Sequence, residues 1–292
     1  MGAAVYGQKI PDFPPVFREK NMQYTPSALW LSPPDDLKQR LGRCLDEALD
    51  MRLSAEPVIT FFRADDIGAP GKQFARVIEI FSRHRVPLSL AVVPHWLHEA
   101  RWKAIRSIAG ENPSLWCWHQ HGRSHKNYEP EGQEKQEFGP ARTTGQIIED
   151  LEEGWKRLVS LMGDEFYPVF TPPWNRCSKE TLGLIGELAY YAISRKQGAV
   201  PTAPRRLPDL AVNTDLHTRK ETDPEQGWNA LFTELKQSVA GGFCGIMLHH
   251  QRMNGAAFDF LELLVQSLKN ADRFRLFHFR NMVGSLGLRG SI

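Results

Sequence analysis

From residue 57 onward, short apolar runs alternate with amphipathic segments, and this alternation constrains the fold more than any other feature of the sequence. Short apolar runs rich in β-branched residues are typical of buried strands, and apolar residues that recur every three to four positions indicate helices. The predicted strands are 57–63, 87–94, 115–119, 167–170, 190–194, 210–214, 243–248 and 274–279. The predicted helices among them are 72–84, 99–109, 143–162, 178–188, 226–240 and 255–270. Strands that alternate with helices pair in parallel, so we predict an α/β fold with a closed or nearly closed barrel.

The residues before the alternation have a different character. Residues 1–30 are rich in Pro and aromatic residues and show no periodicity, so we expect an extended arm. A helix opens after Pro33 and Pro34, with acidic residues in its first turn, and extends to about Leu53. We therefore predict two parts, an arm and helix that pack on the domain (1–56) and the barrel itself (57–292).

Composition excludes several classes of partner. The formal net charge of +2 gives no indication of a nucleic-acid or anionic membrane partner, and no apolar run reaches the length of a membrane-spanning helix. The first ten residues lack the basic region and apolar core of a secretory signal. The four cysteines are scattered without the spacing of a metal motif. We expect a cytoplasmic protein without a membrane span, and the sequence leaves its oligomeric state open.

Two adjacent carboxylates, Asp65 and Asp66, follow the first predicted strand. The carboxyl ends of strands are where α/β folds build their sites. Two like charges side by side cost free energy unless a cation or a shared proton offsets the repulsion. Taken alone, the pair also fits a simple turn at the end of a strand.

Two histidines spaced four residues apart, His121 and His125, follow the third predicted strand. If this segment is helical, both imidazoles lie on one face and reach one ion. An Asp oxygen then completes three protein ligands and leaves positions open for water and substrate, as in a catalytic zinc site. His119 and His121 form a competing pair, but strand alternation leads us to expect that one of these two faces inward, and we favour His121 with His125.

A further histidine, His249, ends the apolar run 243–248. In a barrel, a side chain at this end of a strand points toward the same mouth as the acidic pair. Imidazole titrates near neutral pH and suits a general acid. A structural, hydrogen-bonded histidine is the alternative interpretation.

These motifs, taken in order, resemble those of the polysaccharide deacetylases of carbohydrate esterase family 4. Asp65-Asp66 is similar to the second half of the Thr-Phe-Asp-Asp-Gly motif, although Ile67 precedes Gly68 here. The segment from His121 to His125 has the spacing of His-Ser/Thr-x-x-His, with Gly122 at the second place. Thr171-Pro172-Pro173-Trp174-Asn175 is similar to Arg-Pro-Pro-Tyr/Trp-Gly, and Leu248-His249 to the last motif. The resemblance covers about residues 57–285, and the ordered set is more specific than any one motif.

The resemblance implies a distorted (β/α)7-type barrel that holds one divalent ion, Zn²⁺ first, with Co²⁺ or Ni²⁺ as alternatives. It implies that Asp66, His121 and His125 bind the metal. Asp65 would be the general base and His249 the general acid. The resemblance places the Trp174 backbone N–H, with Pro173 beside it, at the oxyanion and substrate.

The sequence also departs from the family pattern. The Arg that steadies the catalytic Asp is Thr171 here, and Arg63 or Arg176 is our candidate to replace it. The position of a Trp that contacts the sugar acetyl group is held by Leu216. Asp215 either pairs with the replacing Arg or ends a strand, and the sequence leaves both open.

The leading functional hypothesis is a metal-dependent hydrolase that removes an N-linked acyl group, acetyl first, from a small-molecule or saccharide substrate. The same site on the same fold would also suit a non-sugar C–N bond in a ureide or cyclic amide. A non-catalytic carbohydrate-binding domain is the third hypothesis, and the changes at Thr171 and Leu216 motivate it.

Overall fold

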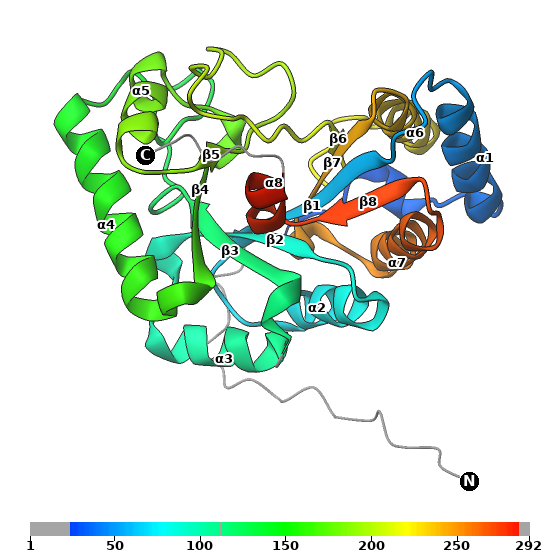
Figure 1. Ribbon diagram of the computed structural model, residues 1–292, viewed down its shortest axis with the longest axis horizontal. Helices are drawn as coiled ribbons and strands as arrows, with labels where there is room; N and C mark the ends of the chain where they lie inside the picture. Colours follow the sequence, from blue (N-terminus) through cyan, green and yellow to red (C-terminus); the bar gives the residue numbers. More distant parts are fainter. Residues whose placement is uncertain (1–23, 111, 286–292) are drawn as a thin grey trace, which may run out of the picture.

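The computed structural model describes residues 24–110 and 112–285 (Figure 1). A curled parallel sheet forms the centre of the molecule. Its strands are β1 (Val58–Ile67), β2 (Leu88–Val92), β3 (Trp116–His121), β4 (Phe166–Thr171), β5 (Ala192–Ile193), β6 (Thr214–Asp215), β7 (Phe243–Leu248) and β8 (Phe274–Phe277). The strand order is β5-β4-β3-β2-β1-β7-β6, with β8 paired to β1, and each pairing is parallel. The predicted distorted (β/α) barrel is confirmed.

An irregular segment bridges the barrel between β5 and β7. Leu210 N donates to Ile193 O and Val212 N to Arg195 O, both at 2.8 Å, and Asn213 N donates to Gly245 O at 2.9 Å. The predicted strand 210–214 is therefore extended, but the regular strand β6 begins only at Thr214. The Asn213 side chain accounts for the late start, because it takes the place of backbone partners on β7, bonding Phe243 O and Gly245 N.

Helices cover the outside of the sheet (Figure 1). They are α1 (Leu37–Asp50), α2 (Lys72–His84), α3 (Glu99–Ala109), α4 (Thr144–Met162), α5 (Lys179–Glu187), α6 (Pro224–Ala240), α7 (Gly255–Asn270) and α8 (Phe279–Ser285). Helix α4 has the capping box formed by Thr143 and Gln146, and α6 begins with Asp223 as its cap and Pro224 at its first position. Helix α1 is shorter than predicted. Within the described residues, no helix combines the length and hydropathy needed to cross a membrane.

The N-terminal arm predicted for residues 1–30 lies mostly outside the described residues. Its described end packs on the barrel helices. Trp30 is buried, its ring lies against Trp228 and Phe260, and its Nε1 donates to Leu216 O at 2.9 Å.

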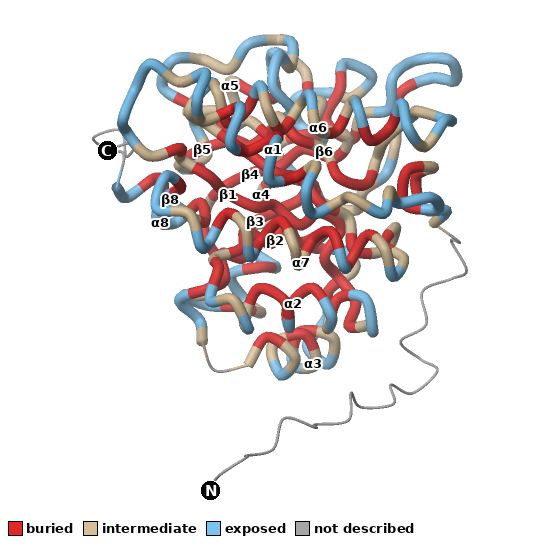
Figure 2. The backbone as a smooth tube through the Cα atoms, turned by 90° about the vertical axis from the view of Figure 1, so that its right-hand side faces the viewer, coloured by how far each residue is buried: buried red, intermediate tan, exposed pale blue. Residues whose placement is uncertain are grey.

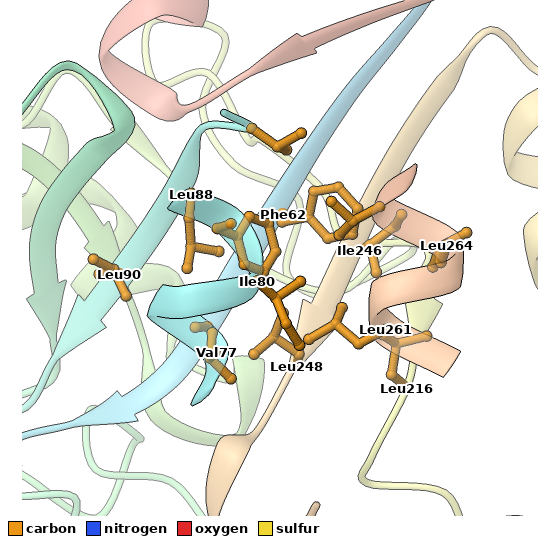
Figure 3. Packing of buried hydrophobic residues seen from close by; sticks show 14 of the residues in the cluster. Phe62, Val77, Ile80, Leu88, Leu90, Leu216, Ile246, Leu248, Leu261 and Leu264 are labelled. Carbon is orange, nitrogen blue, oxygen red and sulfur yellow. The ribbon is translucent and has the colours of Figure 1, made fainter. Parts of the chain in front are cut away.

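Strand alternation separates two layers of side chains. On the outer face, Phe62 of β1 and Ile246 and Leu248 of β7 pack against α2 and α7 (Figure 3). On the inner face, Phe61, Cys117, Val169 and Met247 form a second cluster with residues of α8. Figure 2 shows that the strands are buried along their length, whereas exposed residues gather on the outer helices and loops.

Helix α8 closes the amino-terminal end of the barrel. Phe279 contacts the Phe61 ring at 5.1 Å between centroids, and Arg280 Nη2 donates to the carbonyl of Asp164, which precedes β4. In Figure 1 the helix lies at the centre of the ring of strands. The opposite, carboxyl-terminal end of the barrel therefore remains for the site.

Candidate active site

Alternate residues of four strands point into the barrel and stack toward its carboxyl end. Arg63 and then Asp65 come from β1, His119 and then His121 from β3, and Met247 and then His249 from β7 and its end. The expectation that only one of His119 and His121 faces inward was wrong, because residues two apart share a face of a strand. Both histidines contact Thr171, His119 through the Thr hydroxyl and His121 through the Thr carbonyl, each at 2.9 Å.

His119 lies deeper in the barrel than His121 and does not line the site cavity. Its ring packs on Phe279 of α8, with centroids 4.9 Å apart. Burial, with the Arg63 charge nearby, lowers the pKa of His119 to about 3, so it is a neutral residue of the interior.

The acidic pair lies inside strand β1, which continues to Ile67, beyond its predicted end at residue 63. The register with β2 shifts between Ala64 and Ile67, and Asp66 has a φ of 63°. In a regular strand, neighbouring side chains face opposite sides, whereas an irregularity of this kind redirects one of them. Asp65 and Asp66 consequently line the same cavity, and both are buried.

Arg63 holds Asp65 in place. Its Nε and Nη2 donate to the two carboxylate oxygens of Asp65, each at 2.8 Å, and its side chain is fully buried. Its remaining donors bind the carbonyl and hydroxyl of Ser194 and the Asn175 Oδ1. Burial raises the pKa of Asp65, but the charges of Arg63 and two histidines outweigh it, so the pKa lies below its usual value.

Arg63, and not Arg176, therefore supplies the guanidinium beside Asp65. Arg176 lines the cavity but pairs with Glu134. Asp215 binds the backbone N–H groups of His217 (3.0 Å) and Thr218 (2.9 Å), so its carboxylate closes the turn at the end of β6. Of the two interpretations left open for Asp215, the end of a strand is the one that the hydrogen bonds support.

Asp66, His121 and His125 form a group whose ligand atoms all lie within 4.8 Å of one another. Asp66 Oδ1 is 3.2 Å from the Nε2 atoms of both histidines. Burial raises the pKa of Asp66, but the imidazoles around it outweigh this and hold the pKa well below its usual range. Burial lowers the pKa of His125 to about 4, which leaves its imidazole neutral at neutral pH.

Two observations show that this group suits a cation. Asp66 Oδ1 is buried and receives no well-aligned hydrogen bond from a described residue. The Nδ1 of His121 lies 2.9 Å from Thr171 O, and this bond fixes the tautomer that leaves the lone pair of Nε2 toward Asp66. A buried carboxylate oxygen without a donor, between two imidazole nitrogens, is a donor set of the kind that Zn²⁺ takes.

A tight loop, not a helix, joins His121 to His125. Gly122 and His125 have φ values of 58° and 57°, and the backbone N–H groups of Arg123, Ser124 and His125 converge on the Glu137 carboxylate at 3.2, 2.7 and 3.2 Å. The Ser124 hydroxyl donates to the same carboxylate at 2.9 Å. Burial raises the pKa of Glu137, and these hydrogen bonds oppose it.

Glu137 also explains the glycine at position 122. A Cβ there would lie 2.1 Å from Glu137 Oε2 and 2.6 Å from Pro173 Cγ, in a backbone conformation that favours glycine. Pro173 is buried beneath the loop and is not among the residues that line the cavity, so it supports the histidines from below.

The remaining predicted residues line one cavity of about 970 Å³ together with the acidic pair. His249 Nδ1 is buried without a hydrogen-bond partner among the residues described, and the His249 backbone N–H donates to His217 Nδ1 at 3.1 Å. The His125 ring lies between Trp174 and Trp96, with centroids 4.5 and 5.7 Å away. Trp174 has a φ of 55°. Leu216, in contrast, is a core residue that packs away from the cavity (Figure 3).

Sequence reasoning missed Glu137 and Asn175, which position the His121–His125 loop and Arg63. Glu137 lies in the polar stretch 126–142, where no periodicity distinguishes a buried carboxylate from exposed ones. The Gly at position 122, in place of Ser or Thr, is the signal that such a group fills the space.

Comparison with known proteins gives matches in structure alone. No family model matches the sequence, and no curated protein matches it. The fold is similar to that of a protein from Mycobacterium smegmatis named as a polysaccharide deacetylase, with a TM-score of 0.61 and 15% identity over 80% of this chain and 91% of the other. A similarly named protein from Pseudomonas aeruginosa PAO1 gives a TM-score of 0.56 and 14% identity over 78% and 90%. The T48 deacetylase, solved with substrate, gives 0.51 and 14% over 79% and 92%.

These proteins share little sequence with the chain, but their structures match across nine tenths of their own length. The comparison therefore confirms at the level of the fold what the order of motifs predicted. The chain has the fold of the polysaccharide deacetylases, as a divergent example of it.

Proposed function

We propose that the protein is a metal-dependent hydrolase that removes an N-linked acyl group, acetyl in the first instance, from a saccharide. The observation that carries the proposal is the division of the acidic pair. Asp65 is held by Arg63, whereas the neighbouring Asp66 has a free oxygen beside two imidazole nitrogens in the same cavity. Neighbouring carboxylates with different partners are how sites assign different tasks to chemically identical groups.

Asp66, His121 and His125 would hold one divalent ion, Zn²⁺ first and Co²⁺ or Ni²⁺ as alternatives. When bound, such an ion supplies positive charge that polarises an acyl oxygen and lowers the pKa of water. The residues around the three ligands favour this use, since Thr171 orients His121 and Glu137 orients the loop that carries His125.

Asp65 would accept a proton from the attacking water. Arg63 uses one lone pair on each carboxylate oxygen, and a second lone pair on each oxygen remains for a proton or a water. The guanidinium keeps the carboxylate ionised and fixes its plane, so the base is in its acceptor form and orientation before substrate binds.

His249 would protonate the departing nitrogen. Its side chain lines the cavity from the β7 end, while the bond from its backbone to His217 fixes its position. The Trp174 backbone N–H would donate to the developing oxyanion, and the left-handed conformation of Trp174 is the kind of strained geometry found at such positions. Trp96 and Trp174 supply aromatic faces for a sugar ring.

The proposal is tested by metal content and acetate release on the same preparations. We expect about one metal per chain, lost in Asp66→Ala and His121→Ala. We expect Asp65→Asn to retain the metal while turnover of N-acetylated saccharides falls by at least ~10²-fold, the lower bound for loss of a general base. Asp46→Asn, an exposed Asp of α1, is the matched control and should change neither quantity.

Two results would contradict the proposal. A protein that binds no divalent metal under saturating conditions is not this hydrolase. Unchanged turnover in Asp65→Asn removes Asp65 as the base. Ureides and cyclic amides belong in the same substrate panel, since release of their products without acetate release would assign the site to a different C–N bond.

A further inference from the structure

The walls of the site cavity carry cations that have no carboxylate partner. Lys135, Lys196, Lys220 and Arg252 line the same cavity as Asp65 and Asp66. None of these four forms an ion pair with another described residue, in contrast to Arg176, which pairs with Glu134. Arg252 lies over the Tyr24 ring at 5.2 Å, a contact that leaves its charge uncompensated.

The carboxylates of the lining are already committed. Asp65 binds Arg63, Asp66 faces two imidazoles, Asp215 accepts backbone N–H groups, and Glu234 pairs with Arg219. The free charge in the cavity is therefore positive, and a divalent ion on Asp66 would increase it.

Three of the four cations come from one side of the mouth. Lys196 follows β5, Lys220 follows β6 and Arg252 follows β7. These elements are neighbours, because the backbone at Lys196 pairs with Val212, just before β6, and β6 pairs with β7. A cleft lined by charges of one sign focuses the electric field and raises the local concentration of the opposite ion.

From this arrangement we infer that the substrate is an anionic saccharide, whose carboxylate or phosphate lies on the Lys196, Lys220 and Arg252 side of the cavity while its acylamino group reaches Asp65 and Asp66. The inference rests on the proposed function for the place of the acylamino group. It narrows the substrate class, since neutral oligosaccharides leave these charges unused.

The test measures binding of ligands that have no acyl group, so it does not depend on turnover. Calorimetry compares glucose, glucose 6-phosphate and glucuronate on the wild-type protein, on Lys196→Gln/Lys220→Gln and on Lys38→Gln. Lys38 is an exposed lysine of α1, outside the residues that line the cavity, and provides the same change of charge elsewhere. Both substituted lysines in the cavity are exposed, and circular dichroism checks that the variants fold.

We expect at least one of the two anions to bind the wild type ~10-fold or more tightly than glucose at 50 mM salt. We expect this ratio to fall at least ~5-fold in the double variant and to persist in Lys38→Gln. The ratio should also shrink between 50 and 300 mM salt, because the charges are screened. Which anion binds better identifies phosphate or carboxylate as the group.

Equal affinity for glucose and both anions overturns the inference. So does an anion preference that survives the loss of both lysines, because a metal-bound phosphate would behave in this way. Failure of the proposed function is a separate result, read from acetate release and metal content, and it leaves these binding ratios measurable.

Discussion

Removal of the Arg63 guanidinium should expose how strongly the interior of the barrel depends on one ion pair. In Arg63→Met the stem volume is retained, but Asp65 loses both of its charge-assisted bonds and Ser194 and Asn175 each lose a donor. Breaking a buried ion pair from one side costs about 3–5 kcal/mol, because the remaining charge is left without compensation. At roughly 2 °C per kcal/mol for a chain of this size, the midpoint of thermal unfolding should fall by ~6–10 °C.

A double-mutant cycle separates the pair from the general disruption of packing. Asp65→Asn removes the charge that Arg63 compensates, so the double variant should be about 2 kcal/mol more stable than the sum of the single effects predicts. Urea denaturation in the presence of a chelator measures the free energy of unfolding without a contribution from bound metal. Arg76→Met breaks an exposed pair with Asp259 and should cost less than ~1 kcal/mol. Additive single effects, or a loss in Arg63→Met no larger than in Arg76→Met, would refute the reasoning.

Three further predictions concern the loop and the buried histidines. Glu137→Gln keeps the shape of the side chain but not its charge, so metal affinity measured by competition with a chelating dye should fall ~10–100-fold. Gly122→Ser places a Cβ against Glu137 and Pro173 and should destabilise the protein by roughly 1–3 kcal/mol in urea denaturation. Burial holds the pKa of His217 well below its usual value, so it stays neutral in the fold while the unfolded chain binds a proton below pH ~6.5. Stability should therefore decline as pH falls below ~6.5, and His217→Asn should reduce that slope by up to ~1.4 kcal/mol per pH unit.

Each of these has its own control. Glu134→Gln, an exposed neighbour in the same loop, should leave metal affinity unchanged, and an equal loss there would show that the effect is only one of net charge. Gly132→Ser also lies at positive φ but meets no atom within 4 Å, so it isolates the backbone part of the cost at Gly122. For His217, an unchanged slope in the Asn variant would show that other groups carry the acid sensitivity.

The sequence predicted the barrel because strand and helix periods differ and because buried parallel strands appear as apolar runs. It predicted the site residues because side chains at successive strand ends meet at one mouth. Arg63 followed from the same rule, since it lies two residues before Asp65 on one strand. The same rule, applied correctly, places His119 on the inner face with His121, and the misjudgement there came from treating residues two apart as if they alternated.

What the sequence did not predict depends on backbone irregularity and on contacts distant in the chain. The φ of 63° at Asp66 has no local signal, since Asp is compatible with a regular strand as well. Glu137 reaches the histidine loop from a polar stretch without periodicity, and the barrel is completed by a segment near Asn213 that has little regular structure. These features arise from tertiary packing, which overrides local preference.

A column of contacts runs through the barrel from its floor to the proposed metal ligands. Phe279 of the C-terminal helix α8 packs on His119, His119 bonds the Thr171 hydroxyl, and the Thr171 carbonyl bonds His121. The last helix of the chain is therefore a mechanical support for a metal ligand at the opposite end of the barrel. Shortening the chain before Phe279, or fusing a domain that displaces α8, would alter the aim of His121 without touching the cavity, so expression constructs and engineered fusions should preserve that helix.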